Sequence, residues 1–360
     1  MNPIRKVLLF LRRSKSRESN LCTNGGLVLE ELISCFGGRY NVPMRCFTTK
    51  ELQRALRNVS GHGRRNFFCK MFTGNLEERP VLIRCFTGIA TCVVWHLAPT
   101  NVVIRDIVVT SQMSHLKNVL HLIGCCLDSA FPVMVYEYAP GTKFLDECLS
   151  RCIYGKALSW KCRVKIAKDI ASVLLYLHTS FRTPIIFRDL TPSNVLMDPS
   201  GVAKLFDFTF SVFLPPGEVQ VKDHGGSQGG HLDPQYKISG LVTEKTDVYS
   251  FGVLMLALFT GETDAMKYRE GTRERIHIRD YVKDFLVTHQ VKEIADPRML
   301  EDEGNNKDEM EQQLLDFLDL ALRCTEYEGI NRPDMIDVAK ELRQMESTRN
   351  SWNSRAHRNF

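Results

Sequence analysis

The stretch Phe187-Arg188-Asp189-Leu190-Thr191-Pro192-Ser193-Asn194 and the following Lys204-Leu205-Phe206-Asp207-Phe208-Thr209 are the most informative part of the sequence. Asp189 is followed five residues later by Asn194, and Asp207 ends a short apolar segment. A carboxylate can orient an attacking hydroxyl, and acidic or amide oxygens can hold magnesium against phosphate groups. Any one of these residues alone is more often a helix cap or a solvated charge, so the surrounding phrases must carry the interpretation.

Six further phrases occur in a fixed order along the chain. They are His115, Gly124-Cys125-Cys126, Val135-Tyr136-Glu137-Tyr138, Leu232-Asp233-Pro234-Gln235-Tyr236, Asp247-Val248-Tyr249-Ser250-Phe251-Gly252 and Arg332-Pro333. Together with the stretch above, they resemble plant receptor-like and receptor-like cytoplasmic protein kinases over about residues 45–345. The resemblance implies that Asp189 has the catalytic-base position and that Asn194 and Asp207 have the magnesium positions. It also implies that Tyr136 is the gatekeeper and that Asp247 holds the catalytic-loop backbone.

The residue patterns favour the same fold class. Short β-branched and aromatic stretches at 66–72, 80–86 and 133–138 predict a small sheet, with one helix at 105–113 among them. Apolar residues three and four apart predict helices at 160–177, 247–260, 310–324 and 334–345, and the second of these is apolar nearly all round. We therefore expect an α+β, two-lobed kinase-like fold with a β-rich N-lobe and a larger helical C-lobe. The expected divisions are a basic N-terminal arm and linker at 1–44, the lobes at about 45–138 and 139–345, and a tail at 346–360, with a flexible glycine-rich loop at 217–231.

The positions that would touch ATP depart from the family pattern. The three glycines of the phosphate-covering loop fall at Arg64, Asn66 and Cys69, unless Gly61-His62-Gly63 stands in for them. Side chains there keep backbone amides away from phosphate. The family's Val-Ala-Ile-Lys is Val81-Leu82-Ile83-Arg84, so Arg84 replaces the ATP lysine and Leu82 replaces the small residue over adenine. A planar guanidinium is no substitute for a compact ammonium.

Other departures affect charge near the same site. Asp106 replaces the helix glutamate that would face position 84, and two interpretations stay open: an Arg84–Asp106 ion pair or a solvated Asp106. In the catalytic loop, Thr191 replaces a lysine that neutralises the transferring phosphoryl group. Thr209 replaces the glycine after Asp207-Phe208 and is expected to stiffen that turn. Gln235 replaces the glutamate partner of Arg332, which predicts at most a neutral hydrogen bond there.

The lost phosphate contacts and the retained packing phrases indicate a pseudokinase. The chain is similar to plant receptor-like cytoplasmic pseudokinases that act as immune adaptors. That resemblance implies a coiled-coil nucleotide-binding leucine-rich-repeat (NLR) resistance protein and other receptor-like cytoplasmic kinases as partners. It implies an NLR contact through the small lobe and a kinase contact through the activation segment. No cofactor is then required, and magnesium, if bound, would be held by Asn194 and Asp207. The alternative is a weakly active serine/threonine kinase that uses Asp189, Asn194 and Asp207.

Composition bounds the remaining classes. The 47 Lys+Arg and 42 Asp+Glu give a net charge of +5, but residues 1–17 alone carry +6, so the remainder sums to −1. The body is therefore not a basic nucleic-acid-binding surface. The longest apolar run near the start is five residues, which predicts neither a membrane span nor a secretory signal. The 12 cysteines are expected to be reduced thiols in a cytoplasmic chain. For residues 1–17, a solvated tail and a weak peripheral contact with the plasma membrane both stay open.

Overall fold

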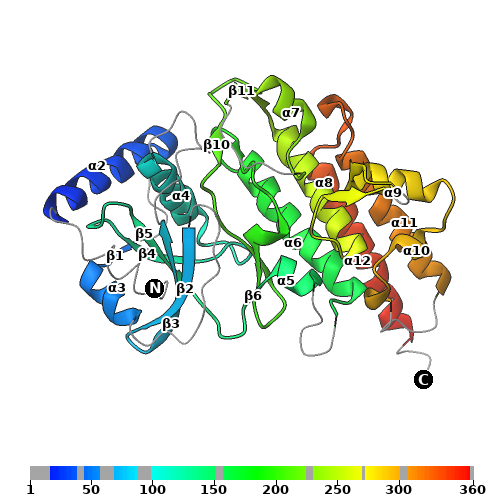
Figure 1. Cartoon of the computed structure of the whole chain (residues 1–360), viewed down its shortest axis with the longest axis horizontal. Helices are drawn as coiled ribbons and strands as arrows, with labels where there is room; N and C mark the ends of the chain where they lie inside the picture. The colour runs from blue at the N-terminus through cyan, green and yellow to red at the C-terminus, as the bar shows by residue number, and fades with distance from the viewer. Residues whose placement is uncertain are drawn as a thin grey trace. The chain divides into compact units, whose positions relative to one another are not determined.

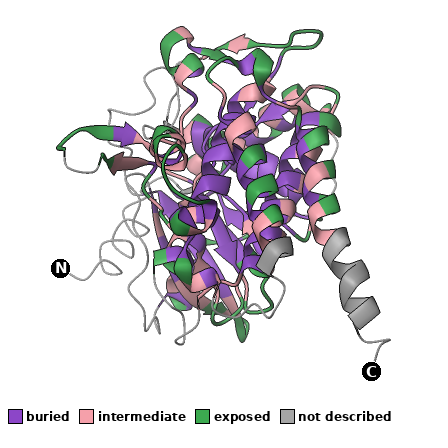
Figure 2. Cartoon of the chain, turned by 90° about the vertical axis from the view of Figure 1, so that its right-hand side faces the viewer, coloured by how far each residue is buried: buried purple, intermediate pink, exposed green. Residues whose placement is uncertain are grey.

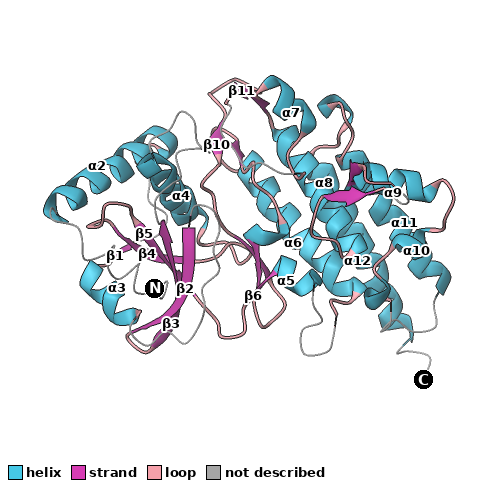
Figure 3. Ribbon diagram, in the orientation of Figure 1, coloured by secondary structure: helices cyan, strands magenta, loops and turns pink. Residues whose placement is uncertain are grey.

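The computed structural model describes residues 17–38, 44–56, 69–86, 99–150, 157–223, 230–269, 272–300 and 307–356 (Figure 1). The chain forms two compact units. The first unit comprises Met1–Thr142 with Asp198–Ser200 and Lys204–Ser211, and the second comprises Lys143–Met197, Gly201–Ala203 and Val212–Phe360. Figure 3 shows a strand-rich first unit and a mainly helical second unit, which confirms the expected α+β class. The lobe boundaries predicted from the sequence stay predictions.

The first unit is built on a five-stranded sheet with the order β1-β4-β5-β3-β2. Its strands are β1 (Arg45–Cys46), β2 (Cys69–Leu76), β3 (Arg79–Phe86), β4 (Leu122–Cys126) and β5 (Val133–Glu137). All neighbours are antiparallel except β1 and β4, which are parallel. The predicted stretches at 80–86 and 133–138 are confirmed as strands to within a residue. Of the predicted stretch 66–72, residues 69–72 lie in β2, and residues 66–68 lie outside the described residues.

A two-residue turn joins β2 to β3. Both turn residues, Glu77 and Glu78, have positive φ angles, of 50° and 64°. Left-handed backbone at both central positions is the geometry that matches the twist of a hairpin, and asparagine or glycine usually supplies it. Here two glutamates adopt it, and Glu77 is held by Arg45, whose Nη2 lies 2.9 Å from its Oε1. The turn fixes the register that places Arg84 opposite Met71.

Three helices accompany the sheet: α2 (Arg17–Phe36), α3 (Thr49–Ala55) and α4 (Pro99–Met113). The helix predicted at 105–113 is therefore confirmed but begins six residues earlier. Helices α2 and α3 were not predicted. Thr48 and Glu51 form a capping box at the start of α3. Helix α2 packs along α4 (Figure 1), and its Asn24 side-chain amide donates to the carbonyls of Leu127 and Ser129 at 2.8 and 3.0 Å.

The second unit contains eight α-helices among its described residues. They are α5 (Leu145–Ser150), α6 (Trp160–Thr179), α7 (Pro234–Ser239), α8 (Glu244–Thr260), α9 (Ile278–Leu286), α10 (Val291–Ile294), α11 (Lys307–Cys324) and α12 (Met335–Ala356). Short strands connect them: β6 (Lys143–Phe144), β7 (Ile185–Ile186), β8 (Val195–Met197), β10 (Val212–Phe213), β11 (Val221–Lys222), β12 (Leu241–Val242), β13 (Met266–Tyr268) and β14 (Arg275–His277). Strand β9 (Ala203–Leu205) has residues in both units. The four helices predicted after residue 160 are confirmed, and α12 continues past the predicted end.

The core of the second unit centres on α8. Every residue from Thr246 to Phe259 is buried, so the prediction of a helix that is apolar nearly all round is confirmed. Figure 2 shows buried segments beside helices whose residues alternate between buried, intermediate and exposed. A Cβ at Gly252 would lie 2.7 Å from side-chain atoms of both Cys324 and Thr325, so only glycine permits this approach of α8 to α11. Helix α8 also carries Asp247, which accepts hydrogen bonds from the backbone of Phe187 and Arg188. In the predicted loop 217–231, β11 pairs with β12, and residues 224–229 lie outside the described residues.

Candidate functional site

Arg84 lies at the centre of a buried charge cluster in the first unit. From β3 its guanidinium reaches Asp106 on α4 and Asp207 in the segment after β9. It forms an ion pair with Asp106, and its Nη2 lies 2.6 Å from Asp207 Oδ1. The Arg84 side chain is 1% exposed and that of Asp106 is 0% exposed. The predicted Arg84–Asp106 pair is therefore confirmed, and the structure adds Asp207 as a second anion, which no local sequence pattern links to Arg84.

Hydrogen bonds complete the cluster. The Thr209 hydroxyl accepts from Arg84 Nη2 and donates to Asp106 Oδ2, each at 3.1 Å. The other Asp106 oxygen accepts from the Thr110 hydroxyl at 2.9 Å and from the Phe208 backbone N–H at 3.0 Å. Thr209, predicted only to stiffen its turn, thus supplies a hydroxyl that bridges cation and anion. Together these bonds tie the Asp207-Phe208-Thr209 segment to α4.

The cluster keeps its arginine charged. Burial by itself lowers the pKa of Arg84, but the attraction of Asp207 and of the other groups around it holds that pKa well above its ordinary value. The third guanidinium donor, Nε, also has an acceptor, because it lies 3.3 Å from the sulfur of Cys69. Cys69 stands at the third glycine position of the phosphate-covering loop, and the other two positions, Arg64 and Asn66, lie outside the described residues. A permanent cation therefore occupies the place between the two carboxylates.

The residues of this cluster do not fit a magnesium–nucleotide pair. Magnesium requires free oxygen ligands in near-octahedral geometry, and Asp207 already holds a guanidinium. A divalent ion about 4 Å from that guanidinium would be repelled by about 8 kcal/mol at an effective dielectric constant of about 20. Displacing Arg84 would instead leave a buried cation without its anions. No group of three or more His, Cys, Asp or Glu residues with metal-site geometry occurs in the described parts of the chain.

The positions predicted to face adenine lie on neighbouring strands. Leu82 on β3 is paired in register with Tyr136 on β5, and both are buried. The Tyr136 hydroxyl lies 3.3 Å from the sulfur of Met134. A leucine at position 82 adds three carbon atoms to the family's alanine, and extra methylenes in a fitted pocket are destabilising. Leu82 and Tyr136 thus obstruct the adenine end of the predicted nucleotide site, as the Arg84 cluster obstructs its phosphate end.

The second unit brings Asp189 and Asn194 together. The Asn194 side-chain amide donates to the backbone carbonyl of Asp189 at 2.7 Å and to its Oδ2 at 2.9 Å. Asp247 accepts from the backbone N–H groups of Phe187 and Arg188, both at 2.8 Å. The predicted role of Asp247 in holding this backbone is confirmed. The catalytic loop therefore keeps an ordered geometry, although Thr191 stands where the family has a lysine.

Arg188 links the catalytic loop to the activation segment. Its Nη2 donates to the Tyr236 hydroxyl at 2.8 Å, and its Nη1 lies 3.2 Å from Asp223 Oδ2. Its backbone is left-handed, with φ of 69°. In the family, the arginine at this position can bind a phosphate on the activation segment. Here Arg188 binds the carboxylate of Asp223. Asp223 was not singled out in the sequence, because nothing local to it indicates a partner 35 residues away.

One sequence prediction about charge is wrong. Arg332 was expected to have at most a neutral hydrogen bond, but its Nη1 and Nη2 donate to the two carboxylate oxygens of Asp233 at 2.7 and 2.8 Å. Gln235 instead accepts from the Gly329 backbone N–H at 3.0 Å. The buried ion pair has thus moved two residues along the chain, since Asp233 caps α7 and faces the same guanidinium. The substitution changes the partner of Arg332 without removing its charge compensation.

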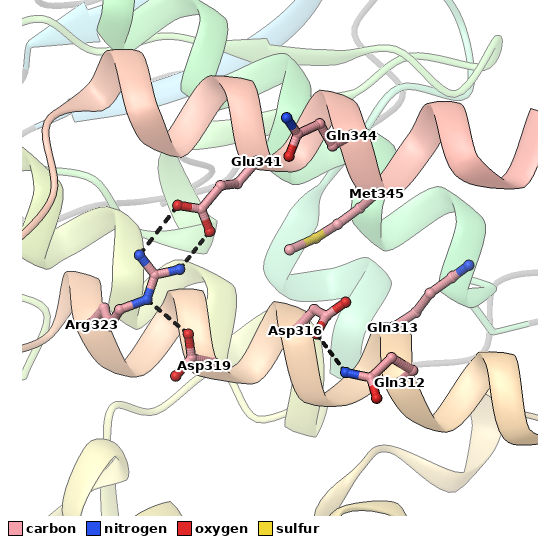
Figure 4. A pocket seen from close by; sticks show the side chains of 8 residues that line it. All are labelled: Gln312, Gln313, Asp316, Asp319, Arg323, Glu341, Gln344 and Met345. Atoms are coloured by element: carbon pink, nitrogen blue, oxygen red, sulfur yellow. Dashed lines mark hydrogen bonds and ion pairs between the residues drawn. The ribbon is translucent and has the colours of Figure 1, made fainter.

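A groove lined by polar side chains lies between α11 and α12 (Figure 4). Arg323 lies across it, with Nε 2.8 Å from Asp319 and Nη2 2.5 Å from Glu341. Gln312 donates to Asp316 at 2.8 Å. The groove's charged groups therefore satisfy one another, and the predicted site residues lie elsewhere.

Among the described residues, no helix has the length and apolar character needed to cross a membrane.

Comparisons with known proteins agree with this geometry. Residues 96–343 match the model of the protein kinase domain. The chain is 39% identical over 333 residues to the non-functional pseudokinase ZED1 of Arabidopsis thaliana, covering 90% of this chain and 95% of that protein. It is 35% identical to the serine/threonine-protein kinase ZRK4 and 34% identical to the non-functional pseudokinase ZRK2 of the same plant. These two matches cover 95% and 94% of this chain, and 98% and 94% of the relatives.

Proposed function

This chain belongs to the protein kinase family, and from that premise we propose that it is a pseudokinase that works by binding other proteins. The observation that carries the proposal is the buried contact of Arg84 with both Asp106 and Asp207. The guanidinium supplies from within the chain the positive charge that ATP-bound magnesium supplies in an active kinase. The names of several relatives, among them ZED1 and ZRK2, support the same assignment. In this proposal, the Arg84 cluster keeps its conformation without a bound nucleotide.

We propose that the bound proteins are those of a plant immune adaptor: a coiled-coil NLR resistance protein and other receptor-like cytoplasmic kinases. Three exposed apolar side chains on α2, those of Leu21, Leu29 and Ile33, support an NLR contact on the first unit. These side chains are 44%, 48% and 56% exposed. Leu29 and Ile33 lie four residues apart and so share one helix face, whereas Leu21 lies on the side of the buried Val28 and Leu32. Exposed apolar clusters of this kind mark contact surfaces.

A second exposed apolar set supports a kinase contact at the activation segment. Ile238 on α7 is 76% exposed, and Val219 and Leu241 are also exposed. Leu241 lies on β12, which pairs with β11 within the same segment. The two partner surfaces therefore belong to different units, and each can be changed without altering the residues of the other.

Pull-down with candidate NLR proteins and candidate receptor-like cytoplasmic kinases tests the adaptor function. Leu29→Asp should abolish NLR recovery and leave kinase recovery unchanged, and Ile238→Asp should do the reverse. Glu30→Ala, a neighbouring exposed change on α2, should leave both unchanged. Recovery of neither partner class by the wild-type chain contradicts the adaptor function. The pseudokinase assignment would survive that result, because it rests on the Arg84 cluster.

A weakly active serine/threonine kinase is the second candidate function. It is favoured by the intact Asp189–Asn194 hydrogen bonds and by the kinase name of ZRK4. A phosphotransfer assay with labelled ATP and a generic protein substrate separates the two. The pseudokinase predicts equal background incorporation for wild type and Asp189→Asn. Incorporation that Asp189→Asn removes would establish the kinase.

For residues 1–17 we propose a weak peripheral contact with the plasma membrane from the cytoplasmic side. Residues 1–16 lie outside the described residues, so the proposal rests on the +6 charge of this arm. Flotation with anionic and neutral vesicles, with and without residues 1–17, tests it. The contact predicts recovery of the full chain on anionic vesicles alone. Equal recovery of both chains would leave a solvated tail.

A further inference from the structure

Two cysteines face each other across the edge of the first unit's sheet. Cys46 on β1 and Cys125 on β4 are register partners in the parallel pair. Neighbouring strands lie about 4.8 Å apart, which is within the Cα separation that a disulfide bridges. Cys46 is exposed, whereas Cys125 is fully buried. One thiol of the pair is thus open to solvent, and its partner on the neighbouring strand is not.

A missing side chain brings the two strands together. Gly124 is paired with Arg45, and a Cβ at Gly124 would lie 2.0 Å from the Arg45 carbonyl oxygen. The Phe47 N–H donates to the Cys125 carbonyl at 2.8 Å, which fixes the register next to the pair. Gly124 on one side of the thiol pair and the Phe47 hydrogen bond on the other therefore set the close approach of β1 to β4.

The surroundings favour a reactive thiolate at the outer position. The Cys125 thiol and the Leu127 backbone N–H both donate to the Cys46 sulfur, and the first of these contacts does most to lower the pKa of Cys46 to about 7. Burial and the nearby carboxylates of Asp128 and Glu51 act in the opposite direction and are outweighed. An ordinary thiol has a pKa of about 8.5, so the fraction present as thiolate at neutral pH is larger for Cys46 than for an ordinary thiol.

Cys126, the next residue, does not compete for this role. Successive side chains on a strand point to opposite faces, so Cys126 points away from the face that Cys125 shares with Cys46. It packs in the apolar core cluster and lies 2.8 Å from Asp128 Oδ1. The pair is therefore specific to Cys46 and Cys125.

We propose that Cys46 and Cys125 form a peroxide-sensitive modification site, in which Cys46 is oxidised and Cys125 closes a disulfide. The Cys46 thiolate attacks one oxygen of hydrogen peroxide, the O–O bond breaks, and hydroxide leaves, giving a sulfenic acid. The Cys125 sulfur then attacks the sulfenic sulfur, the S–O bond breaks, and the Cys125 proton leaves with that oxygen as water. Two thiols are oxidised by two electrons, and one peroxide is reduced to two waters.

The disulfide would stabilise the β1 edge of the sheet, which few hydrogen bonds now hold in place. Strand β1 has two residues and leads into α3, whose Leu52 and Ala55 belong to the apolar cluster under the sheet. A cross-link between positions 46 and 125 closes a loop of about 80 residues, which restricts the unfolded chain strongly. Oxidation is therefore expected to stabilise this part of the first unit.

Peptide mapping after mild oxidation tests the site. The full chain is treated with one equivalent of hydrogen peroxide, blocked with iodoacetamide and digested without reductant. The expected result is a Cys46–Cys125 cross-linked peptide and a rise in Tm of several degrees that dithiothreitol reverses. Cys125→Ser should leave Cys46 as a sulfenic acid that dimedone labels. Cys162→Ser, which removes another exposed thiol, should leave the cross-link unchanged.

Alkylation rates keep the test independent of how the variants fold. In the wild-type chain at pH 7, Cys46 should react with iodoacetamide about fivefold faster than an ordinary exposed thiol, for which Cys22 and Cys162 serve as internal references. Equal rates at the three cysteines would overturn the proposal. So would a cross-link from Cys46 to Cys126, or oxidation that leaves positions 46 and 125 unlinked.

Discussion

Arg84 places a permanent cation between two carboxylates that an active kinase uses for other purposes. Lysine at this position carries a compact charge with three rotatable donors, whereas the guanidinium carries five donors in a fixed fork. That fork reaches Asp106, Asp207, Thr209 and the sulfur of Cys69 at once. The substitution is therefore a rearrangement of the site around a new charge and not a simple loss of contact. Position 106, shortened from glutamate to aspartate, matches the longer cation.

Replacing Arg84 with alanine should destabilise the protein by about 3–5 kcal/mol, because Asp106 and Asp207 would stay buried without their cation. Arg84→Lys should cost less, since one ammonium can hold one carboxylate but cannot reach all four partners. Urea unfolding followed by circular dichroism measures both. Arg79→Ala, at an exposed position of the same strand, is the control and should change stability by less than about 0.5 kcal/mol. An Arg84→Ala protein as stable as this control would show that the cluster does not hold the site together.

His231 gives the second unit a pH-dependent stability. Burial lowers its pKa from 6.5 to about 4, and its Nδ1 has no hydrogen-bond partner among the described residues. Between these values the unfolded chain binds more protons than the folded chain. The free energy of unfolding should therefore fall as pH decreases from 6.5 to 4, by at most about 3 kcal/mol from this group.

The variant His231→Asn removes this titration and should flatten the stability profile between pH 4 and 6.5. Urea unfolding of wild type and variant at several pH values measures it. His289→Asn, at an exposed position, should retain the wild-type slope. Parallel profiles for wild type and His231→Asn would mean that the ring is solvated in the folded protein.

At the scale of elements, the activation segment is tied to the catalytic loop without a phosphate. Strand β11 pairs with β12, and Asp223, the residue after β11, forms an ion pair with Arg188. Arg188 also lies over the Tyr236 ring, with its guanidinium carbon 5.4 Å from the ring centroid. The arginine thus has a carboxylate and an aromatic partner from two parts of the segment. These contacts support a segment whose position is set by the chain itself.

Asp223→Ala should loosen this segment while leaving most of the second unit unchanged. The amides of β11 and β12 should exchange hydrogen about tenfold faster, because the variant loses an ion pair to a buried arginine. Asp223→Glu should restore slow exchange, and Glu218→Ala, an exposed acid nearby, should have no effect. Hydrogen exchange read by mass spectrometry gives the rates. Unchanged exchange in Asp223→Ala would assign the order of the segment to strand pairing alone.

Helices α2 and α3 show where prediction from sequence reached its limit at this scale. The sequence of α2 contains Asn20, Asn24, Gly25 and Gly26, which are poor helix formers. It is held by burial of Val28 and Leu32 and by the two hydrogen bonds from Asn24 to residues more than 100 positions away. Such long-range bonds leave no local pattern. Helix α6, by contrast, was predicted because its own spacing of apolar residues defines the buried face.

Across the whole molecule, the ordered phrases of the catalytic region predicted the fold class, because they include backbone-holding residues such as Asp247. The changed positions that would touch ATP predicted the pseudokinase assignment. The Arg84–Asp106 pair was predicted because the two family positions normally pair. The participation of Asp207 and Thr209, and the move of the Arg332 partner to Asp233, required coordinates. Each depends on which of several nearby polar groups a long arginine reaches.

Thermal unfolding with ATP and magnesium is the most direct test of the claim that Arg84 has replaced nucleotide and metal. A site with a Kd of about 10 μM would stabilise the protein by about 2.7 kcal/mol at about 1 mM ligand, which raises Tm by a few degrees. If Arg84 replaces nucleotide and metal, wild type shows no magnesium-dependent change in Tm at millimolar ATP. A magnesium-dependent rise of a few degrees that Asp207→Asn abolishes would contradict it.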